Sequence, residues 1–171
     1  MNCRPVRFRQ GFGVAATLLL AEAAHGGCGK PPPSPAAEPA RYVTEGGLVY
    51  DRETNLTWDR CSIGQTWATA GCSGTVLLLT WDQAAKHATG GWRLPSQSEL
   101  ESLVVAACRN PAIDENLFPN LGAGKYWYWS SSALTATSAW VVYFGSGTAS
   151  PIGHAFTNAV RLVQSGRVAA P

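Results

Sequence analysis

Two short stretches in which apolar and polar positions alternate, residues 47–51 and 55–59, lie on either side of a polar turn. Alternation with a period of two places successive side chains on opposite faces of a strand. We therefore expect residues 47–51 and 55–59 to form a β-hairpin. The folded domain is expected to begin just before this hairpin, at Arg41, and to extend to residue 171.

Two later stretches show the spacing of amphipathic helices, and each begins with a capping pattern. Gln83 follows Thr80 by three residues, and Glu99 follows Ser96 by three, which is the spacing of a capping box. Glycine and proline interrupt helices, so we expect the first helix to end at residues 90–91 and the second at residues 110–111. The apolar positions at helical spacing are Trp81, Ala84, Ala85 and Ala88, and then Leu100, Leu103, Val104 and Ala107.

The last third of the chain is rich in aromatic residues. Residues 126–129 are four aromatics in a row, and the segments 139–144 (AWVVYF) and 159–163 (AVRLV) read as strands. A hairpin, two helices and then short strands with turns indicate an α+β fold. From residue 116 to residue 171 there is no Asp or Glu, so this segment is suited to surface contact and not to proton transfer.

We interpret the late segment as a binding surface. Alternation along residues 139–144 places Trp140, Val142 and Phe144 on one side of the strand, and Val141 and Tyr143 on the other. Tyrosine provides contact area at low entropic cost, and Ser and Thr provide adaptable hydrogen bonds. The alternative for the aromatic members is a place in the core. The candidate ligand-binding residues are Tyr143, Ser146, Thr148, Ser150, Ile152, His154 and Phe156, and the alternative concerns Tyr143 and Phe156.

Other large side chains are expected to be structural. Trp92, Trp129 and Trp140 are predicted to anchor strands and loops. Arg161 lies in an apolar segment, so we expect it to be a paired, structural arginine. The same is expected of Arg93, with Glu99 or Asp114 as its partner.

Residues 1–27 have the pattern of an export signal, with three arginines before an apolar stretch at residues 11–21 that is too short to cross a bilayer. Cys28 follows small residues, and this order resembles the lipobox of bacterial lipoproteins. We therefore predict that Cys28 is lipidated and that residues 28–40, rich in proline, form a tether to the membrane. The alternative is an ordinary secretory signal. The expected location is the bacterial cell envelope, at the outer membrane or cell surface.

The remaining cysteines predict one disulfide. In an exported chain, Cys61 and Cys72 are expected to pair and close a small loop. Cys108 is left over and is expected to be a buried thiol, with pairing to Cys61 or Cys72 as the alternative. A zinc site needs more ligands than this segment offers, and no metal or cofactor is expected.

The formal net charge of +2 comes from residues 1–27, because ten basic residues face ten acidic ones from Cys28 onward. A neutral mature chain offers no basic face to nucleic acid or to another polyanion. The expected partners are a protein or glycan on another cell or surface, and the membrane through the lipid anchor.

The order of these motifs resembles that of the DUF1566 family, which includes the C-terminal domain of the Legionella collagen-like adhesin. The resemblance covers residues 47–163 and implies a C-type-lectin-like fold of the formylglycine-generating-enzyme type, used for adhesion. It rests on nine blocks: LVYD (48–51), LTW (56–58), TW (80–81), WRLP (92–95), EL (99–100), NPAID (110–114), FP (118–119), YWSS (128–131) and VRLV (160–163).

A narrower resemblance is to the variable proteins of diversity-generating retroelements. The blocks WSS (129–131) and AWVV (139–142) precede a turn-rich stretch that ends in AVRLV (159–163). This resemblance implies that residues 143–158 form a diversified contact surface on an exported protein.

Two other functions follow from the same resemblance. The formylglycine-generating relatives use a late cysteine pair, whereas here no cysteine follows Cys108 and the only base after Glu115 is His154, so we expect no enzymatic activity. Calcium-dependent lectins bind the ion through carboxylates, which the late half lacks. A lectin on this fold would therefore be calcium-independent and would stack sugars on aromatic rings.

Overall fold

The computed structural model describes residues 40–69, 71–121 and 127–170. The predicted export signal, the lipidation position Cys28, the tether up to residue 39 and the first aromatic of the run at 126–129 lie outside the described residues. The described part consists mostly of antiparallel strands with two short helices, so the expected α+β class is confirmed. None of its helices is long and apolar enough to cross a membrane.

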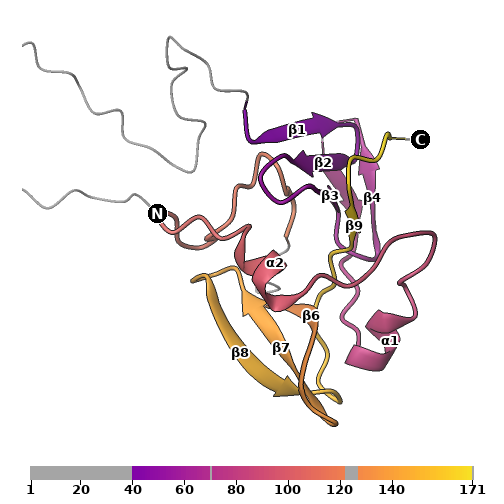
Figure 1. Cartoon of the computed structure of the whole chain (residues 1–171), viewed down its shortest axis with the longest axis vertical. Coiled ribbons are helices and arrows are strands. Elements are labelled where there is room, and N and C mark those ends of the chain that lie inside the picture. The colour runs from indigo at the N-terminus through magenta and orange to yellow at the C-terminus, as the bar shows by residue number, and fades with distance from the viewer. Residues whose placement is uncertain (1–39, 70, 122–126, 171) are drawn as a thin grey trace, which may run out of the picture.

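The first sheet brings the two ends of the domain together. The predicted hairpin is confirmed as two antiparallel strands, with Leu48 opposite Asp59, and Asn55 has a positive φ of 54° in the turn between them. A preceding strand and a closing strand, neither of which was predicted with these limits, pair on its two sides (Figure 1). The four strands, in spatial order, are β1 (Tyr42–Glu45), β2 (Leu48–Asp51), β3 (Leu56–Asp59) and β9 (Val163–Ser165).

The two helices start where they were predicted and end much earlier. Both capping boxes are present, at the start of α1 (Trp81–Ala85) and of α2 (Gln97–Glu101). Beyond each helix the chain continues in tighter turns, in which Ala88 N–H bonds to Ala85 O and Val104 N–H bonds to Glu101 O. The apolar spacing was read as a longer α-helix because successive i to i+3 turns preserve much of the same apolar stripe.

The second sheet contains β6 (Trp127–Thr135), β7 (Ser138–Tyr143) and β8 (Thr148–Gly153), in that spatial order. The predicted strand at 139–144 is confirmed, shifted by one residue. The predicted closing strand at 159–163 is not continuous, since only Val163 belongs to β9 and Ala159 makes an isolated bridge to Tyr128. The segment divides its backbone hydrogen bonds between the two sheets and thus links them.

Two apolar clusters lie on opposite faces of the second sheet. Val141 and Val142 are neighbours on β7, point to opposite faces, and are both fully buried in different clusters. The larger cluster contains Trp58, Leu100, Tyr128, Val142 and Phe144, and the smaller contains Ala84, Leu94, Trp129, Val141 and Val160. Because both faces are covered at its centre, the sheet is an interior layer there.

A third, two-stranded element carries the predicted disulfide. Strands β4 (Gln65–Ala68) and β5 (Gly71–Gly74) form a hairpin inside the loop that the Cys61–Cys72 bond closes, so this pairing is confirmed. Cys108 is half-exposed and disulfide-bonded, so the expectation of a buried thiol is wrong. Its partner is neither Cys61 nor Cys72, which bond to each other.

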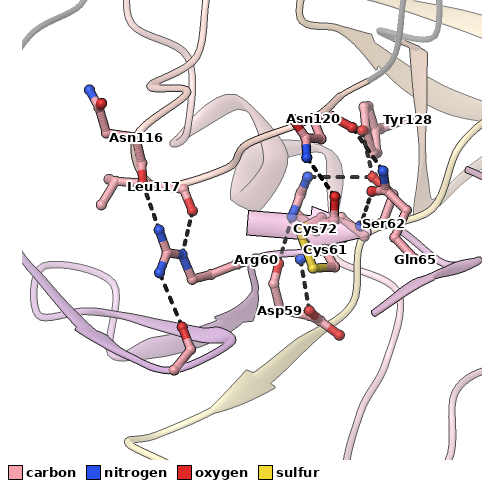
Figure 2. Close-up of a disulfide and its surroundings, with 12 residues drawn as sticks. Asp59, Arg60, Cys61, Ser62, Gln65, Cys72, Asn116, Leu117, Asn120 and Tyr128 are labelled. Carbon is pink, nitrogen blue, oxygen red and sulfur yellow. Dashed lines mark hydrogen bonds between the residues drawn. A yellow bond between two sulfur atoms is a disulfide. The ribbon is translucent and has the colours of Figure 1, made fainter. Parts of the chain in front are cut away.

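Arg161 is fully buried where the two sheets meet. Its guanidinium donates to Asp59 O at 2.7 Å and to Ser62 Oγ at 3.4 Å, and lies over the rings of Phe118 and Tyr128 at 4.7 Å and 5.6 Å. Ser62 Oγ is itself 2.7 Å from the hydroxyl of Tyr128, next to the disulfide (Figure 2). In the described chain no carboxylate forms an ion pair with Arg161, so carbonyl, hydroxyl and aromatic groups stabilise its charge.

We predict that Arg161→Met lowers the free energy of unfolding by about 2–3 kcal/mol, because it removes charged hydrogen-bond donors and leaves buried acceptors unpaired. Urea denaturation at pH 7 measures the change. Arg167→Met is the matched control, since the Arg167 side chain is 58% exposed, and it should change stability by less than about 0.5 kcal/mol. Equal stabilities of the two variants would contradict a structural role for Arg161.

Candidate ligand-binding surface

The seven predicted contact residues lie at the end of β7, along β8 and in the turns on either side of β8. Thr148, Ser150 and Ile152 share one face of β8, because side chains alternate along a strand. Ser150 lies opposite Val141, and Ile152 lies opposite Ala139 and packs against the smaller apolar cluster. The Ile152 end of this face is therefore partly covered by the core, whereas Thr148 at the other end is exposed. The two ends of β8 are about 17 Å apart at the usual rise of a strand.

One end of β8 carries a row of three residues across the sheet. Trp127, Tyr143 and Thr148 are register partners on neighbouring strands, and the Trp127 and Tyr143 rings stack with centroids 4.6 Å apart. The hydroxyls of Ser146 and Thr148 lie 2.9 Å apart. Trp127 is 36% exposed, Thr148 is exposed and Tyr143 is half-buried. Tyr143 is thus partly accessible and belongs neither to the deep core nor to a fully free surface.

The other end of β8 carries His154 and Phe156. The His154 ring stacks almost parallel on Trp81, with centroids 4.3 Å apart and planes 8° apart. The Trp81 indole is fixed in turn by its Nε1–H, which donates to Ser130 O at 2.9 Å. The Phe156 side chain is 61% exposed, so the structure places it outside the core.

A hollow of about 440 Å³ opens beside His154. It lies between the start of α1, which provides Thr80 and Asp82, and the β6–β7 turn, which provides Thr137. His154 N–H donates to Thr137 O at 2.8 Å, which fixes the two walls relative to each other. The His154 Nε2 atom is buried and has no hydrogen-bond partner within the described chain.

Phe156 borders this hollow. Its ring lies 3.6 Å from the point that a Cβ on Gly153 would occupy, and Gly153 lines the hollow. The lining of the hollow therefore combines one carboxylate from Asp82, hydroxyl groups and an imidazole, and the exposed Phe156 ring lies next to this lining at Gly153. This set of groups can bind a polar ligand through hydrogen bonds and an apolar one through ring contact.

The residues predicted to be structural occupy three environments. Trp129 is fully buried and its Nε1–H donates to Leu79 O at 2.7 Å. Trp92 is half-buried against the smaller apolar cluster. Trp140 is half-exposed and lies opposite Pro151, on the face of β7 away from Val141.

Arg93 forms a bidentate ion pair, and its partner is Glu99 and not Asp114. Both guanidinium nitrogens bond to the two Glu99 oxygens at 2.7 Å. These hydrogen bonds hold the pKa of the Glu99 carboxyl below its ordinary value, although partial burial opposes them. Glu99 also accepts from Ser96 N–H in the capping box, so the WRLP segment and α2 are fixed to each other.

Sequence reasoning missed the residues that α1 contributes to the hollow. Trp81 is correctly predicted to lie on the apolar face of a helix, and the structure places Asp82 in the first turn of that helix. Only the folded chain brings them next to His154, more than seventy residues away. No group of three His, Cys, Asp or Glu side chains that could hold a metal ion occurs among the described residues.

Comparison with known proteins gives a family. The model of the Lcl C-terminal domain matches residues 47–164, which is most of the chain and nearly the range on which the sequence motifs rest. No curated protein matches the chain. The match includes strands β2 to β8, both helices and every predicted contact residue, whereas β1 precedes it and β9 extends one residue past its end. The chain therefore belongs to the family of the Lcl C-terminal domain, named after the Legionella collagen-like protein.

Proposed function

We propose that this protein is a binding module displayed on a bacterial surface, which holds a protein or glycan ligand and does not transform it. The observation that carries this proposal is the hollow beside His154 together with the exposed Phe156 ring. Large exposed aromatic side chains next to polar groups are typical of contact surfaces. Membership of a family named after a surface adhesin supports the same function.

The way in which the hollow is built favours binding. The stack of His154 on Trp81 and the hydrogen bond from His154 N–H to Thr137 O fix its walls before a ligand arrives, which lowers the entropic cost of binding. Preorganised walls with one exposed aromatic beside them are suited to capturing a partner's side chain or a sugar ring.

We also propose that the fold is C-type-lectin-like. The support is the presence of the first and last described strands in one sheet, the two short helices and a second sheet reached through long irregular connections. On such a fold, contact residues collect on the loops and strands of the second sheet, where β8 lies. An enzymatic function has less support, because His154 is the only histidine lining the hollow and no cysteine lies near it in the sequence.

We predict that Phe156→Ala weakens binding at least about tenfold, or about 1.4 kcal/mol, because an exposed ring at the rim contributes contact area without supporting the core. The wild-type protein is first screened on arrays of glycans and of purified cell-surface proteins, and hits are then measured by biolayer interferometry. Leu77→Ala is the control, since Leu77 is also a large exposed apolar residue, at 47%, and does not line the hollow. Absence of any ligand, conversion of a ligand, or equal losses in the two variants would count against the proposal.

We propose that the protein is anchored through a lipid on Cys28. Metabolic labelling with palmitate should label the wild type, and Cys28→Ser should abolish the label while Cys3→Ser leaves it unchanged. Peptide mapping of the disulfides adds a second measurement. The sulfur of Cys28 can carry a thioether-linked lipid or form a disulfide, but it cannot do both. A disulfide between Cys28 and Cys108 in the mature protein would exclude the anchor.

We further propose that a retroelement diversifies the contact surface. Sequencing the gene across sister isolates should show substitutions that cluster between codons 126 and 158 and fall mostly at adenines. Codons 47–95 provide the comparison and should stay constant. Substitutions spread evenly over both regions would indicate a fixed adhesion module instead.

A further inference from the structure

A second hollow, distinct from the surface around β8, has the construction of a binding groove. It has a volume of about 630 Å³, within the usual range for small-molecule sites. Its walls come from the β1–β2 turn, the end of β3, strand β4, the loop between the helices and the last described residues of the chain. The polar and aromatic side chains that line it are Asp59, Gln65, Thr66, Trp67 and Trp92.

Trp67 is held as a fixed platform on one side of this groove. The Arg60 guanidinium lies 3.9 Å from the centre of the Trp67 ring and so covers one of its faces. Arg60 is itself immobilised, because it donates to Leu117 O, Gly46 O and Asn116 O at 2.8, 3.1 and 2.7 Å (Figure 2). These three bonds engage each of its three nitrogens internally, so the guanidinium is fixed in place and orients the ring.

The glycine at position 47 allows this arrangement. A Cβ there would lie only 2.9 Å from Trp67 Cβ, so the indole packs directly against bare backbone. Trp67 and Trp92 both remain half-exposed while lining the groove. Neither indole N–H has a hydrogen-bond partner within the described chain, and neither is among its buried polar atoms, so both are available as donors.

Asp59 supplies the acceptor. Its Oδ1 accepts the Cys61 N–H at 2.8 Å, whereas Oδ2 accepts no hydrogen bond from the described residues (Figure 2). Burial raises the pKa of the Asp59 carboxyl, although the Cys61 N–H and the charge of Arg161 oppose this shift. Gln65, by contrast, is committed at both ends, to Ser62 N–H and to Asn120 O, and forms a rigid wall.

Half-exposed indole rings, unpaired N–H donors and one unpaired carboxylate oxygen match the surface of a pyranose ring. Its C–H face is weakly positive and is attracted to the negative face of an aromatic ring, while its hydroxyls both donate and accept. A sulfated or carboxylated sugar is disfavoured by the charge of Asp59. A quaternary ammonium would fit the rings and the carboxylate but would leave the donors unused. We infer that this groove is a second ligand site and that it binds an uncharged oligosaccharide.

The test is isothermal titration of the whole protein with neutral di- and trisaccharides of glucose, galactose, mannose and N-acetylglucosamine. At least one should bind, and Trp67→Ala should weaken that binding about tenfold or more. Asp59→Asn keeps the acceptor for Cys61 N–H but removes the charge, and should weaken binding about fivefold because charge-assisted bonds are stronger. It also keeps the test decisive if Trp67→Ala fails to fold, which near-UV circular dichroism will show.

Phe156→Ala separates the two sites, since it should leave saccharide binding in the groove unchanged. Binding should also weaken on acidification, as Asp59 protonates. The inference is overturned if no neutral saccharide binds, if choline or a sulfated disaccharide binds while the neutral sugars do not, or if Phe156→Ala and not Asp59→Asn removes the binding.

Discussion

The structure depends on how one buried cation is accommodated where the two sheets meet. Arg161 is fully enclosed, yet within the described chain no carboxylate pairs with it. The carbonyl of Asp59, at the end of β3, and the rings of Phe118 and Tyr128 stabilise its charge instead. Each of these groups comes from a different segment, so their contacts with the arginine fix the first sheet, the loop that carries Phe118 and β6 relative to one another. Removal of any of them would leave a buried charge or carbonyl poorly solvated.

The same packing determines which parts of the surface the core leaves uncovered. Apolar clusters cover both faces of the second sheet at its centre, whereas Thr148 at the start of β8 and Phe156 beyond its end are exposed. One end presents the Trp127–Tyr143 stack, and the other presents the hollow beside His154 with the Phe156 ring at its edge. The groove at Trp67 is built on the other side of the Arg161 junction, from the first sheet and the hairpin within the disulfide loop. Both hollows thus lie at the margins of the apolar core.

Local sequence patterns predicted the short-range elements of this structure well. They did not predict the contacts between residues that are far apart in the sequence. The hairpin at 47–59, both capping boxes and the Cys61–Cys72 bond depend on residues close in sequence, and each is confirmed. The predicted lengths of the helices were too long, because an apolar stripe in the sequence does not distinguish an α-helix from successive tight turns. The prediction that Cys108 is a free thiol was wrong, because the spacing of cysteines along the sequence does not show which of them come together in the fold.

The sequence alone determined the class of fold, the family and the candidate residues on β8, because those depend on short-range periodicity and on the order of motifs. Only the tertiary structure decided that Trp81 and Asp82 join His154, that Glu99 and not Asp114 pairs with Arg93, and that Arg60 supports Trp67. These contacts depend on the directions of side chains that are distant in the chain, and only the packing of the complete core sets those directions.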